Sequence, residues 1–294
     1  FGDYSQNYQA SPNRWSTGLR VDNLTINNVE CGTALGLSGA QSVISSTTIN
    51  TAGEHTHAGS CQPTDPDGEL MYWADGITFD GTDITVENNT VINASDVGIV
   101  NFGGNGIRIL NNRIISEDGN YGALAGIAVH PWGFGEISGM EITGNVVSSK
   151  SHTYCGGIHA GINIGGFMWG RGCVGEAGSG TIGVNGECSS NPNPPSGNRC
   201  QVGQPCQIWA FIPAGESMVL KDNEVSGAHI NYLISGVDNQ GEMVIENNVS
   251  REPRYTDWEA ARNGCFGRTW GPMDYVALFP SLPGWIEMEI FCER

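Results

Sequence analysis

Residues 74–112 decide the fold, and they read ADGITFDGTDITVENNTVINASDVGIVNFGGNGIRILNN. Within this stretch DITVENN (83–89) returns as GIRILNN (106–112), an offset of 23 residues. A second phrase, DGI (75–77), returns as DVGI (96–99), an offset of 21 residues between the two aspartates. Two short apolar strands in each ~20–25 residues, each ended by Gly or Asn, are typical of a coil that stacks on copies of itself.

The same apolar pattern recurs along most of the chain. The predicted strands carry Ile84/Val86, Ile107/Ile109, Met140/Ile142, Val219/Leu220 and Val244/Ile245. An asparagine follows each of them, namely Asn88, Asn111, Asn145, Asn223 and Asn247. The companion strand carries Ile77/Phe79, Ile99, Ile127/Val129, Ile158/Ile162 and Leu233/Ile234. The pattern predicts an all-β chain folded as a right-handed parallel β-helix, in which the stacked asparagines hydrogen-bond as a ladder.

Two stretches interrupt this pattern and set the predicted domain organisation. Residues of about 165–215 are rich in Gly, Pro, Asn and Cys, which predicts a disulfide-rich loop inserted between two coils. The repeat is also lost over 251–294, where Trp and Pro are frequent, and we expect that segment to cap the open end of the helix. The β-helix itself is then predicted over 1–250.

Composition limits the partners and the compartment. A net charge of −18 excludes non-specific binding of nucleic acid, because phosphates require a basic face. No apolar run is long enough to span a membrane. The nine cysteines form no CxxC pair and no zinc-type cluster with histidine, which favours disulfides in an oxidising compartment. We therefore predict a secreted, extracellular or cell-surface protein.

Two aspartates and two histidines are the catalytic candidates. Asp75 and Asp96 precede matching Gly-Ile phrases, so we expect them one above the other on adjacent coils, about 4.8 Å apart. Two carboxylates this close share a proton, share a cation, or hydrolyse glycosides as an acid and a nucleophile or base. His130 and His159 follow the companion strands of later coils, where an imidazole can assist as acid or base. The alternative is that the aspartates only favour the turn before each strand and the histidines are surface residues.

Candidate substrate-binding residues are two cations and two tryptophans. Arg108 and Lys221 alternate outward on their strands, where they are able to bind a carboxylated sugar, but for Arg108 we favour the alternative of an ion pair with Glu141. Trp132 and Trp169 lie in predicted loops, where aromatic rings either stack on sugars or pack the loops against the coils.

Two kinds of further site are indicated. The Asn-x-Ser/Thr pattern makes Asn23 and Asn93 the predicted glycosylation acceptors, whereas Asn88 coincides with the expected ladder. The acidic stretch TDPDGE (64–69) has the alternation of a calcium loop without its full spacing, so Ca²⁺ binding and a solvated acidic loop both remain open. No other cofactor is expected.

The repeats DGITF, ITVENNTVIN, DVGI and GIRILNNRII resemble the parallel β-helix repeats of the pectate-lyase-like superfamily. The resemblance covers about residues 20–165 and 215–250 and implies the right-handed β-helix. The superfamily includes polysaccharide lyases, glycoside hydrolases, epimerases, tailspikes and adhesins. The Asp75 and Asp96 spacing is similar to that of polygalacturonases, whose Gly-His-Gly and Arg-Ile-Lys motifs have no counterpart here.

These observations lead to two functional hypotheses. The first is an extracellular β-helix protein that binds, and by the acid pair cleaves, a polysaccharide along one flank. The second is non-enzymatic: a structural subunit of a surface layer or filament that associates end to end, or a glycan-binding adhesin or tailspike-like module.

Overall fold

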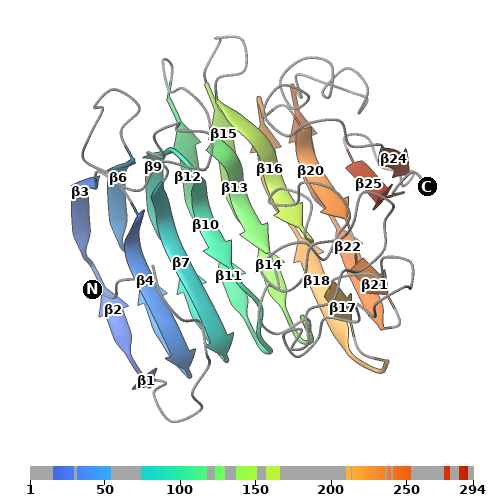
Figure 1. Cartoon of the computed structure of the whole chain (residues 1–294), viewed down its shortest axis with the longest axis horizontal. Coiled ribbons are helices and arrows are strands. Elements are labelled where there is room, and N and C mark those ends of the chain that lie inside the picture. The colour runs from blue at the N-terminus through green and yellow to red at the C-terminus, as the bar shows by residue number, and fades with distance from the viewer. Residues whose placement is uncertain are drawn as a thin grey trace, which may run out of the picture.

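The computed structural model describes residues 16–29, 32–53, 74–117, 123–129, 137–150, 157–165, 210–212, 214–228, 230–235, 237–239, 241–252, 275–278 and 285–290 (Figure 1). Every regular element within these ranges is a β-strand. No helix in this part of the chain has the length and apolar character needed to cross a membrane.

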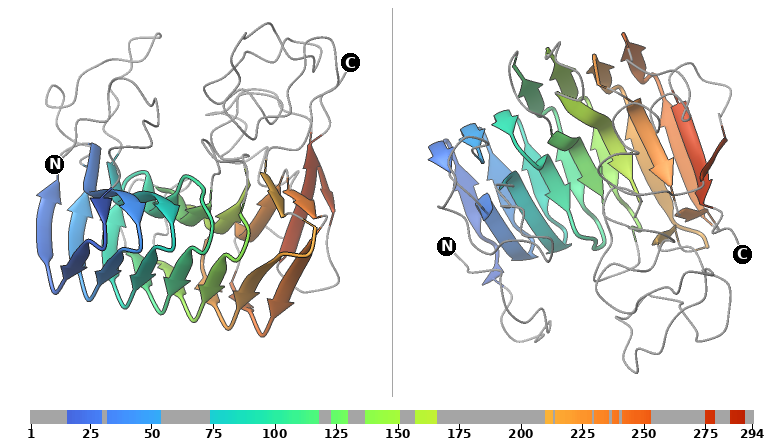
Figure 2. Two further views of the ribbon diagram at one scale, coloured as in Figure 1. Left: turned by 90° about the horizontal axis from the view of Figure 1, so that it is seen from below. Right: turned by 45° about the horizontal axis from the view of Figure 1, so that its top comes forward.

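Three sheets lie side by side around the long axis of the molecule (Figure 2). Sheet A contains β1 (Ser16–Thr17), β4 (Gly32–Ala40), β7 (Ala74–Thr82), β10 (Val97–Asn101), β13 (Ala123–Val129), β16 (Ile158–Ile164), β20 (Ile230–Ser235), β25 (Trp285–Ile290) and β24 (Tyr275–Leu278). Sheet B contains β2 (Arg20–Asp22), β5 (Val43–Ser45), β8 (Thr85–Glu87), β11 (Arg108–Leu110), β14 (Glu141–Thr143), β18 (Ser217–Lys221) and β22 (Glu242–Glu246). Sheet C contains β3 (Thr25–Val29), β6 (Thr48–Ala52), β9 (Thr90–Ala94), β12 (Arg113–Ser116), β15 (Val146–Ser149), β19 (Glu224–Ser226) and β23 (Val249–Arg251). A separate parallel pair joins β17 (Ala210–Ile212) and β21 (Val237–Asn239).

The chain passes through sheets A, B and C in turn and then begins the next coil, so sheets B and C each hold seven parallel strands. The protein is therefore a right-handed parallel β-helix, as predicted, with coils 1 to 7 in chain order. Each coil has three strands, however, and not the two that the sequence pattern indicated. The third strand was missed because sheet C strands are short and follow the sheet B strands after only two residues, so the two apolar runs read as one.

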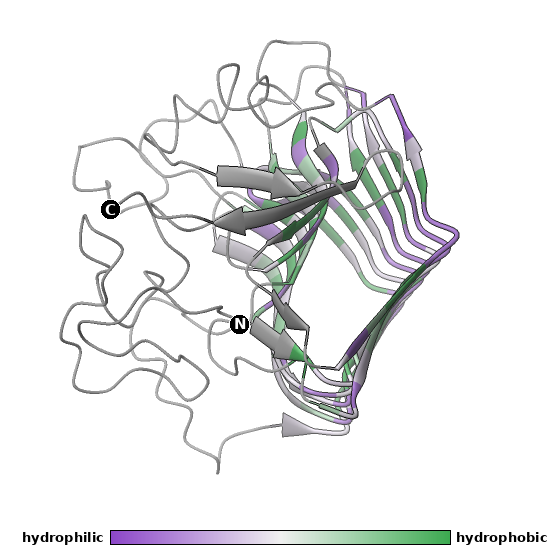
Figure 3. Ribbon diagram, turned by 90° about the vertical axis from the view of Figure 1, so that its right-hand side faces the viewer, coloured by the Kyte–Doolittle hydropathy of each residue, from purple (hydrophilic) through white to green (hydrophobic). Residues whose placement is uncertain are grey.

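The registers confirm the predicted repeat of 23 residues. Val86 pairs with Ile109, as the offset between Ile84 and Ile107 requires. One continuous row of apolar residues crosses sheet B, and it consists of Ile44, Val86, Ile109, Ile142, Leu220 and Ile245. An equivalent row crosses sheet A, and it consists of Leu35, Ile77, Ile99, Ile127, Ile162 and Tyr232. Seen along the axis in Figure 3, the coils superimpose around one interior. The side chains of the two rows lie in the apolar core of this interior, with Leu35 and Ile245 packed against it at the ends of their rows.

The asparagine ladder is present but shifted by one residue at three of its five predicted positions. Its members are Asn89, Asn112, Asn145, Asn223 and Asn248, and each side-chain amide donates to the Oδ1 of the next at 2.9–3.0 Å. Backbone N–H groups of the first four donate to the same Oδ1 atoms.

The residue before each ladder position makes the turn from sheet B to sheet C. Asn88, Asn111 and Asn247 have φ of 53–56°, in the left-handed region that asparagine tolerates. The side chains of all three are exposed. In these three Asn-Asn pairs, therefore, the first asparagine forms the turn and the second enters the ladder.

Glycines are required where the chain turns from sheet C into sheet A, which we call the C–A corner. Gly76, Gly98, Gly126 and Gly161 stack on successive coils there. A Cβ on Gly98 would lie 2.5 Å from the carbonyl oxygen of Gly126 and 2.6 Å from the side chain of Ile114. Because a Cβ would not fit at this position on coils 3 to 6, the stacked glycines help to fix the register of sheet A there.

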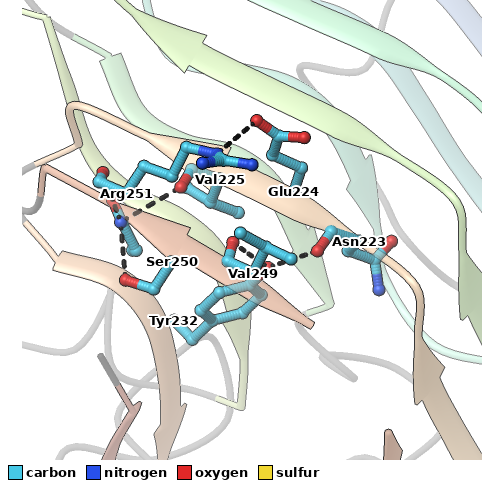
Figure 4. Close-up of polar contacts among 8 residues, drawn as sticks. Asn223, Glu224, Val225, Tyr232, Val249, Ser250 and Arg251 are labelled. Atoms are coloured by element: carbon cyan, nitrogen blue, oxygen red, sulfur yellow. Dashed lines mark hydrogen bonds and ion pairs between the residues drawn. The ribbon is translucent and has the colours of Figure 1, made fainter. Parts of the chain in front are cut away.

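The seventh coil replaces this glycine with Asn231, and the residue packed against it changes from Val225 to the smaller Ser250. The Asn231 amide donates to Ser250 Oγ at 2.8 Å and to the Arg251 carbonyl oxygen at 2.9 Å. The neighbouring Tyr232 hydroxyl lies 3.0 Å from the carbonyl oxygens of both Asn223 and Val249 (Figure 4), and burial raises the pKa of Tyr232. This polar cluster satisfies backbone carbonyls where the regular coils end.

The two predicted interruptions are only partly described. Residues 166–209, which make up most of the predicted inserted loop, lie outside the described residues. Of the predicted cap over 251–294, β25 extends sheet A beside β20 and pairs antiparallel with β24. A capping role for this segment remains a prediction.

Candidate functional site

Asp75 is the second residue of β7 and its carboxylate is held from two directions. The Thr78 hydroxyl donates to Oδ2 at 2.7 Å, and the backbone N–H of Val97, on the next coil, donates to Oδ1 at 3.2 Å. The side chain is only partly buried. Asp75 is thus an oriented carboxylate in a partly buried position.

Asp96 lies in the bend between β9 and β10, at the same C–A corner. Its backbone is fixed, because its N–H donates to the Ala74 carbonyl at 3.1 Å and its carbonyl accepts from the N–H of Leu124 at 2.7 Å. The residue is partly buried, yet its Oδ1 atom is inaccessible and has no hydrogen-bond partner among the described residues. A buried carboxylate oxygen without a donor favours the protonated form of the acid.

The two aspartates are not stacked in register, contrary to the prediction from the 21-residue offset. Ile77 pairs with Ile99, an offset of 22, so Asp75 lies opposite Val97 and Asp96 lies opposite Ala74. The reason is the glycine stack. Asp75 lies one residue before Gly76 and Asp96 lies two before Gly98, so aligning the glycines places Asp96 one residue before the position opposite Asp75. The two carboxyl groups nevertheless remain close enough for the charge of Asp75 to act on Asp96.

The two acids therefore differ in how tightly they hold a proton. Burial raises the pKa of Asp75 to about 6, an effect opposed by the hydrogen bonds from Thr78 and Val97. Burial raises the pKa of Asp96 well above its usual value, and the neighbouring charge of Asp75 raises it further. Of the two, Asp96 accordingly holds its proton to higher pH, and Asp75 is the acid that ionises first as the pH rises.

The rest of the outer face of sheet A is closely covered and carries few charges. The outward side chains of Thr78, Val100, Ala128 and Asn163 form one row across four strands, and each is at most 5% exposed. Asp80 is buried in the next outward position of β7 and accepts a hydrogen bond from the Ser38 hydroxyl. The strands β4, β7, β10, β13, β16 and β20 contain no lysine or arginine.

Of the predicted histidines, only His159 lies within the described residues. It is in β16, 8% exposed, and the register places it in the same row as Leu124 and Asp96. Two coils separate His159 from Asp96, which corresponds to about 10 Å. His130, Trp132 and Trp169 lie outside the described residues, as does the acidic loop at 64–69 that was considered for Ca²⁺.

Arg108 and Lys221 are on sheet B and are not brought together with the aspartates. Arg108 Nε lies 3.2 Å from Glu141 Oε2, so the ion pair that the sequence allowed is confirmed. Lys221 Nζ lies 3.8 Å from Asp222 Oδ2. Both pairs are substantially exposed, so each contributes little to stability. Sugar binding by either residue remains a prediction, and it would involve a different face from that of the acid pair.

The predicted glycosylation acceptors differ in their surroundings. Asn23 is exposed at a sheet B to sheet C turn with φ of 56°. The Asn93 Oδ1 accepts from the backbone N–H of Glu117 at 2.8 Å. Asn88, which was set aside as a ladder residue, is exposed because Asn89 takes the ladder position. Modification of Asn23 and Asn93 is untested.

The sequence did not identify Thr78 or Thr33 as part of the site. In a straight strand, residues three apart point to opposite faces, so Asp75 and Thr78 would not meet. The hydrogen bond from Thr78 to Asp75 shows that the two side chains nevertheless lie on the same side here. An Asp-Gly-x-x motif at a predicted coil corner is the signal that could have indicated this contact. Among the described residues, no group of three or more His, Cys, Asp or Glu side chains is arranged to hold a metal ion.

The raised pKa of Asp75 predicts how stability varies with pH. The folded state holds the proton more tightly than the unfolded chain, so this contribution is complete below about pH 4 and is lost as the pH rises through about 6. We expect the free energy of unfolding to fall by about 2–3 kcal/mol across this range, with Asp96 adding to the loss at higher pH. Urea denaturation at several pH values measures this, and Asp75→Asn should flatten the difference. An equal pH dependence in both proteins would contradict the assignment.

No protein-family model matches the sequence, and no curated protein matches it. Among solved structures, the chain is similar to the surface protein and adhesin PfbA of Streptococcus pneumoniae, with a TM-score of 0.32 and 11% sequence identity. The match covers 78% of this chain and 65% of that chain, slightly less than two thirds of its length.

Proposed function

We propose that this protein hydrolyses a polysaccharide at the C–A corner, with Asp75 and Asp96 as the reacting pair. The observation that supports the proposal is the asymmetry of the two acids: two donors hold Asp75, whereas Asp96 has a buried oxygen with no partner. Glycoside hydrolysis requires one protonated and one ionised carboxyl group flanking the same bond.

The protonation states assign the roles. Asp96, whose pKa is the more strongly raised, donates a proton to the leaving-group oxygen. Asp75 is ionised and acts either as the nucleophile or as the base that activates water. His159, two coils away, is too distant to exchange a proton with Asp96 directly.

The substrate we propose is an uncharged polysaccharide. The six sheet A strands that form coils 2 to 7 contain no lysine or arginine, and the chain carries a net charge of −18. A polyuronate or a sulfated glycan would be repelled by this surface, whereas a neutral sugar would not. The exposed cations of sheet B are paired with acids, which also favours a neutral ligand.

The register counts against the filament alternative. If the first coil of one copy continued the sheets of the seventh coil of another, Asp22 would lie over Glu246 and Leu24 over Asn248. The first contact brings like charges together, and the second leaves the ladder donors of Asn248 facing an apolar side chain. We therefore do not favour end-to-end association through these coils.

A panel of neutral and acidic polysaccharides tests the proposal. Neutral glucans, xylan, mannan and galactan are compared with polygalacturonate, alginate and chondroitin sulfate, and new reducing ends and product masses are measured at acidic and neutral pH. We expect at least one neutral glycan to be depolymerised, with saturated products. Binding in affinity electrophoresis without new reducing ends would support the adhesin alternative and contradict hydrolysis. Unsaturated products from an acidic glycan would instead indicate a lyase.

A further inference from the structure

The environment of Asp75 extends to a second threonine. Thr33, on β4, pairs in register with Asp75 on β7, and its hydroxyl lies 2.8 Å from the hydroxyl of Thr78. Thr78 in turn lies 2.7 Å from Asp75 Oδ2. Coils 2 and 3 thus provide two linked hydroxyls, and coil 4 provides the Val97 N–H to the same carboxylate.

The direction of these hydrogen bonds follows from the number of protons available. An ionised carboxylate only accepts, so Thr78 must donate its single hydroxyl proton to Asp75. The Thr78 oxygen is then left as an acceptor, and Thr33 must donate to it. A hydroxyl that accepts one hydrogen bond while donating another is a stronger donor, because the two bonds polarise each other.

Few other charges act on Asp75 within the described chain. The strands packed against β7 are β4, β6, β9 and β10, and none of them contains a titratable side chain. The acids that remain are Asp96, at the next corner, and Asp80, five residues along the same strand and bonded to Ser38. The hydroxyl pair is therefore the main stabilising group for a negative charge on Asp75 besides the Val97 N–H.

We propose that Thr78, oriented by Thr33, is a positioning residue that keeps Asp75 ionised and aligned while Asp96 retains the proton. This role deepens the proposed function and rests on it for catalysis, but the division of charge is a property of the folded protein that can be measured without a substrate. Both threonines act through Asp75 and not on the sugar.

Titration of the Asp75 carboxyl carbon by nuclear magnetic resonance tests this, with ¹³C-labelled aspartate and Asp75→Asn for assignment. In Thr78→Val, which removes the donor and keeps the shape, we expect the titration midpoint of Asp75 to rise by about one pH unit. Thr78→Ser should restore the midpoint. Thr33→Val should raise it by a smaller amount, because Thr78 can still donate.

The titration midpoints distinguish a positioning role of Thr78 from a purely structural role. An unchanged midpoint in Thr78→Val, or a loss of stability without a shift, would show that Thr78 is only structural and would overturn the inference. If Thr78→Val does not fold, Thr33→Val supplies the same comparison. An unchanged titration midpoint of Asp75 in Thr33→Val would then overturn the inference. A shifted midpoint in a protein that cleaves no glycan would leave the positioning role intact and would contradict the proposed function instead. In an active protein, the acidic limb of the pH–rate profile should shift with the midpoint.

Discussion

Asp96→Asn is expected to lower the turnover of a neutral glycan by about 10²- to 10⁴-fold, the contribution typical of a general acid. The amide keeps the shape of the side chain but cannot supply a proton to the leaving group. The effect should depend on the leaving group. With an aryl glycoside whose phenol departs without protonation, Asp96→Asn should recover most of its activity, whereas Asp75→Asn should not. Measuring kcat for both variants on both substrates therefore separates the two roles.

Asp80→Asn is the matched control for this experiment. Asp80 is a buried aspartate in β7, the strand that also contains Asp75. It accepts a hydrogen bond from Ser38 and lies away from the acid pair. It should retain turnover on both substrates if the effect is specific to Asp75 and Asp96. Similar losses in all three variants would indicate general damage to the folded coils, and full activity of Asp96→Asn would exclude Asp96 as the acid.

Asn112→Ala is expected to lower the free energy of unfolding by about 3–5 kcal/mol, because it leaves several buried polar groups without partners. The Asn112 side chain accepts from the backbone N–H and side-chain amide of Asn89, and it donates to the Val86 carbonyl and to Asn145 Oδ1, all at 2.9–3.0 Å. Alanine provides none of these bonds and the site is closed to water. Urea denaturation followed by circular dichroism measures the loss.

The adjacent Asn111 provides the control, because its side chain is exposed whereas that of Asn112 is buried in the ladder. Asn111 is exposed and has φ of 54°, a conformation that glycine adopts without strain. The equivalent residue of the next coil is already Gly144, with φ of 69°. Asn111→Gly should change stability by less than about 0.5 kcal/mol. If both variants lost the same free energy of unfolding, the ladder asparagine would contribute no more to stability than the exposed turn residue, which would contradict the prediction.

The repeat in residues 74–112 was sufficient to predict the β-helix and the stacking of Val86 on Ile109. It was sufficient because a coil that stacks on itself must place an apolar residue at the same point of each turn. The repeat did not reveal the third sheet, whose strands follow sheet B after only two residues. It also misassigned Asn88, Asn111 and Asn247 to the ladder. Composition cannot distinguish the residue that forms a turn from the residue that follows it.

The candidate site was predicted only in part. Asp75 and Asp96 were identified from their matching Gly-Ile phrases, and the structure brings them to one corner of adjacent coils. Their relative position was wrong by one residue, and Thr33 and Thr78 were missed. Arg108 and Lys221 were expected to serve the same ligand but belong to another sheet, because alternation along a strand gives the side of a sheet and not which sheet faces the site.

The sequence by itself determined that this chain coils, that its interior is apolar and that two aspartates begin neighbouring strands. These properties depend on residue type and spacing, which the chain carries whether or not it is folded. Only the tertiary structure decided which atoms meet. Gly76 stacks on Gly98 because a Cβ there would strike the carbonyl oxygen of the neighbouring coil, and that alignment places Asp96 one residue before the position opposite Asp75. The same close packing buries an oxygen of Asp96 without a donor while Thr78 and Val97 hold Asp75, so the difference between the two acids arises from the packing of coils and not from their identity.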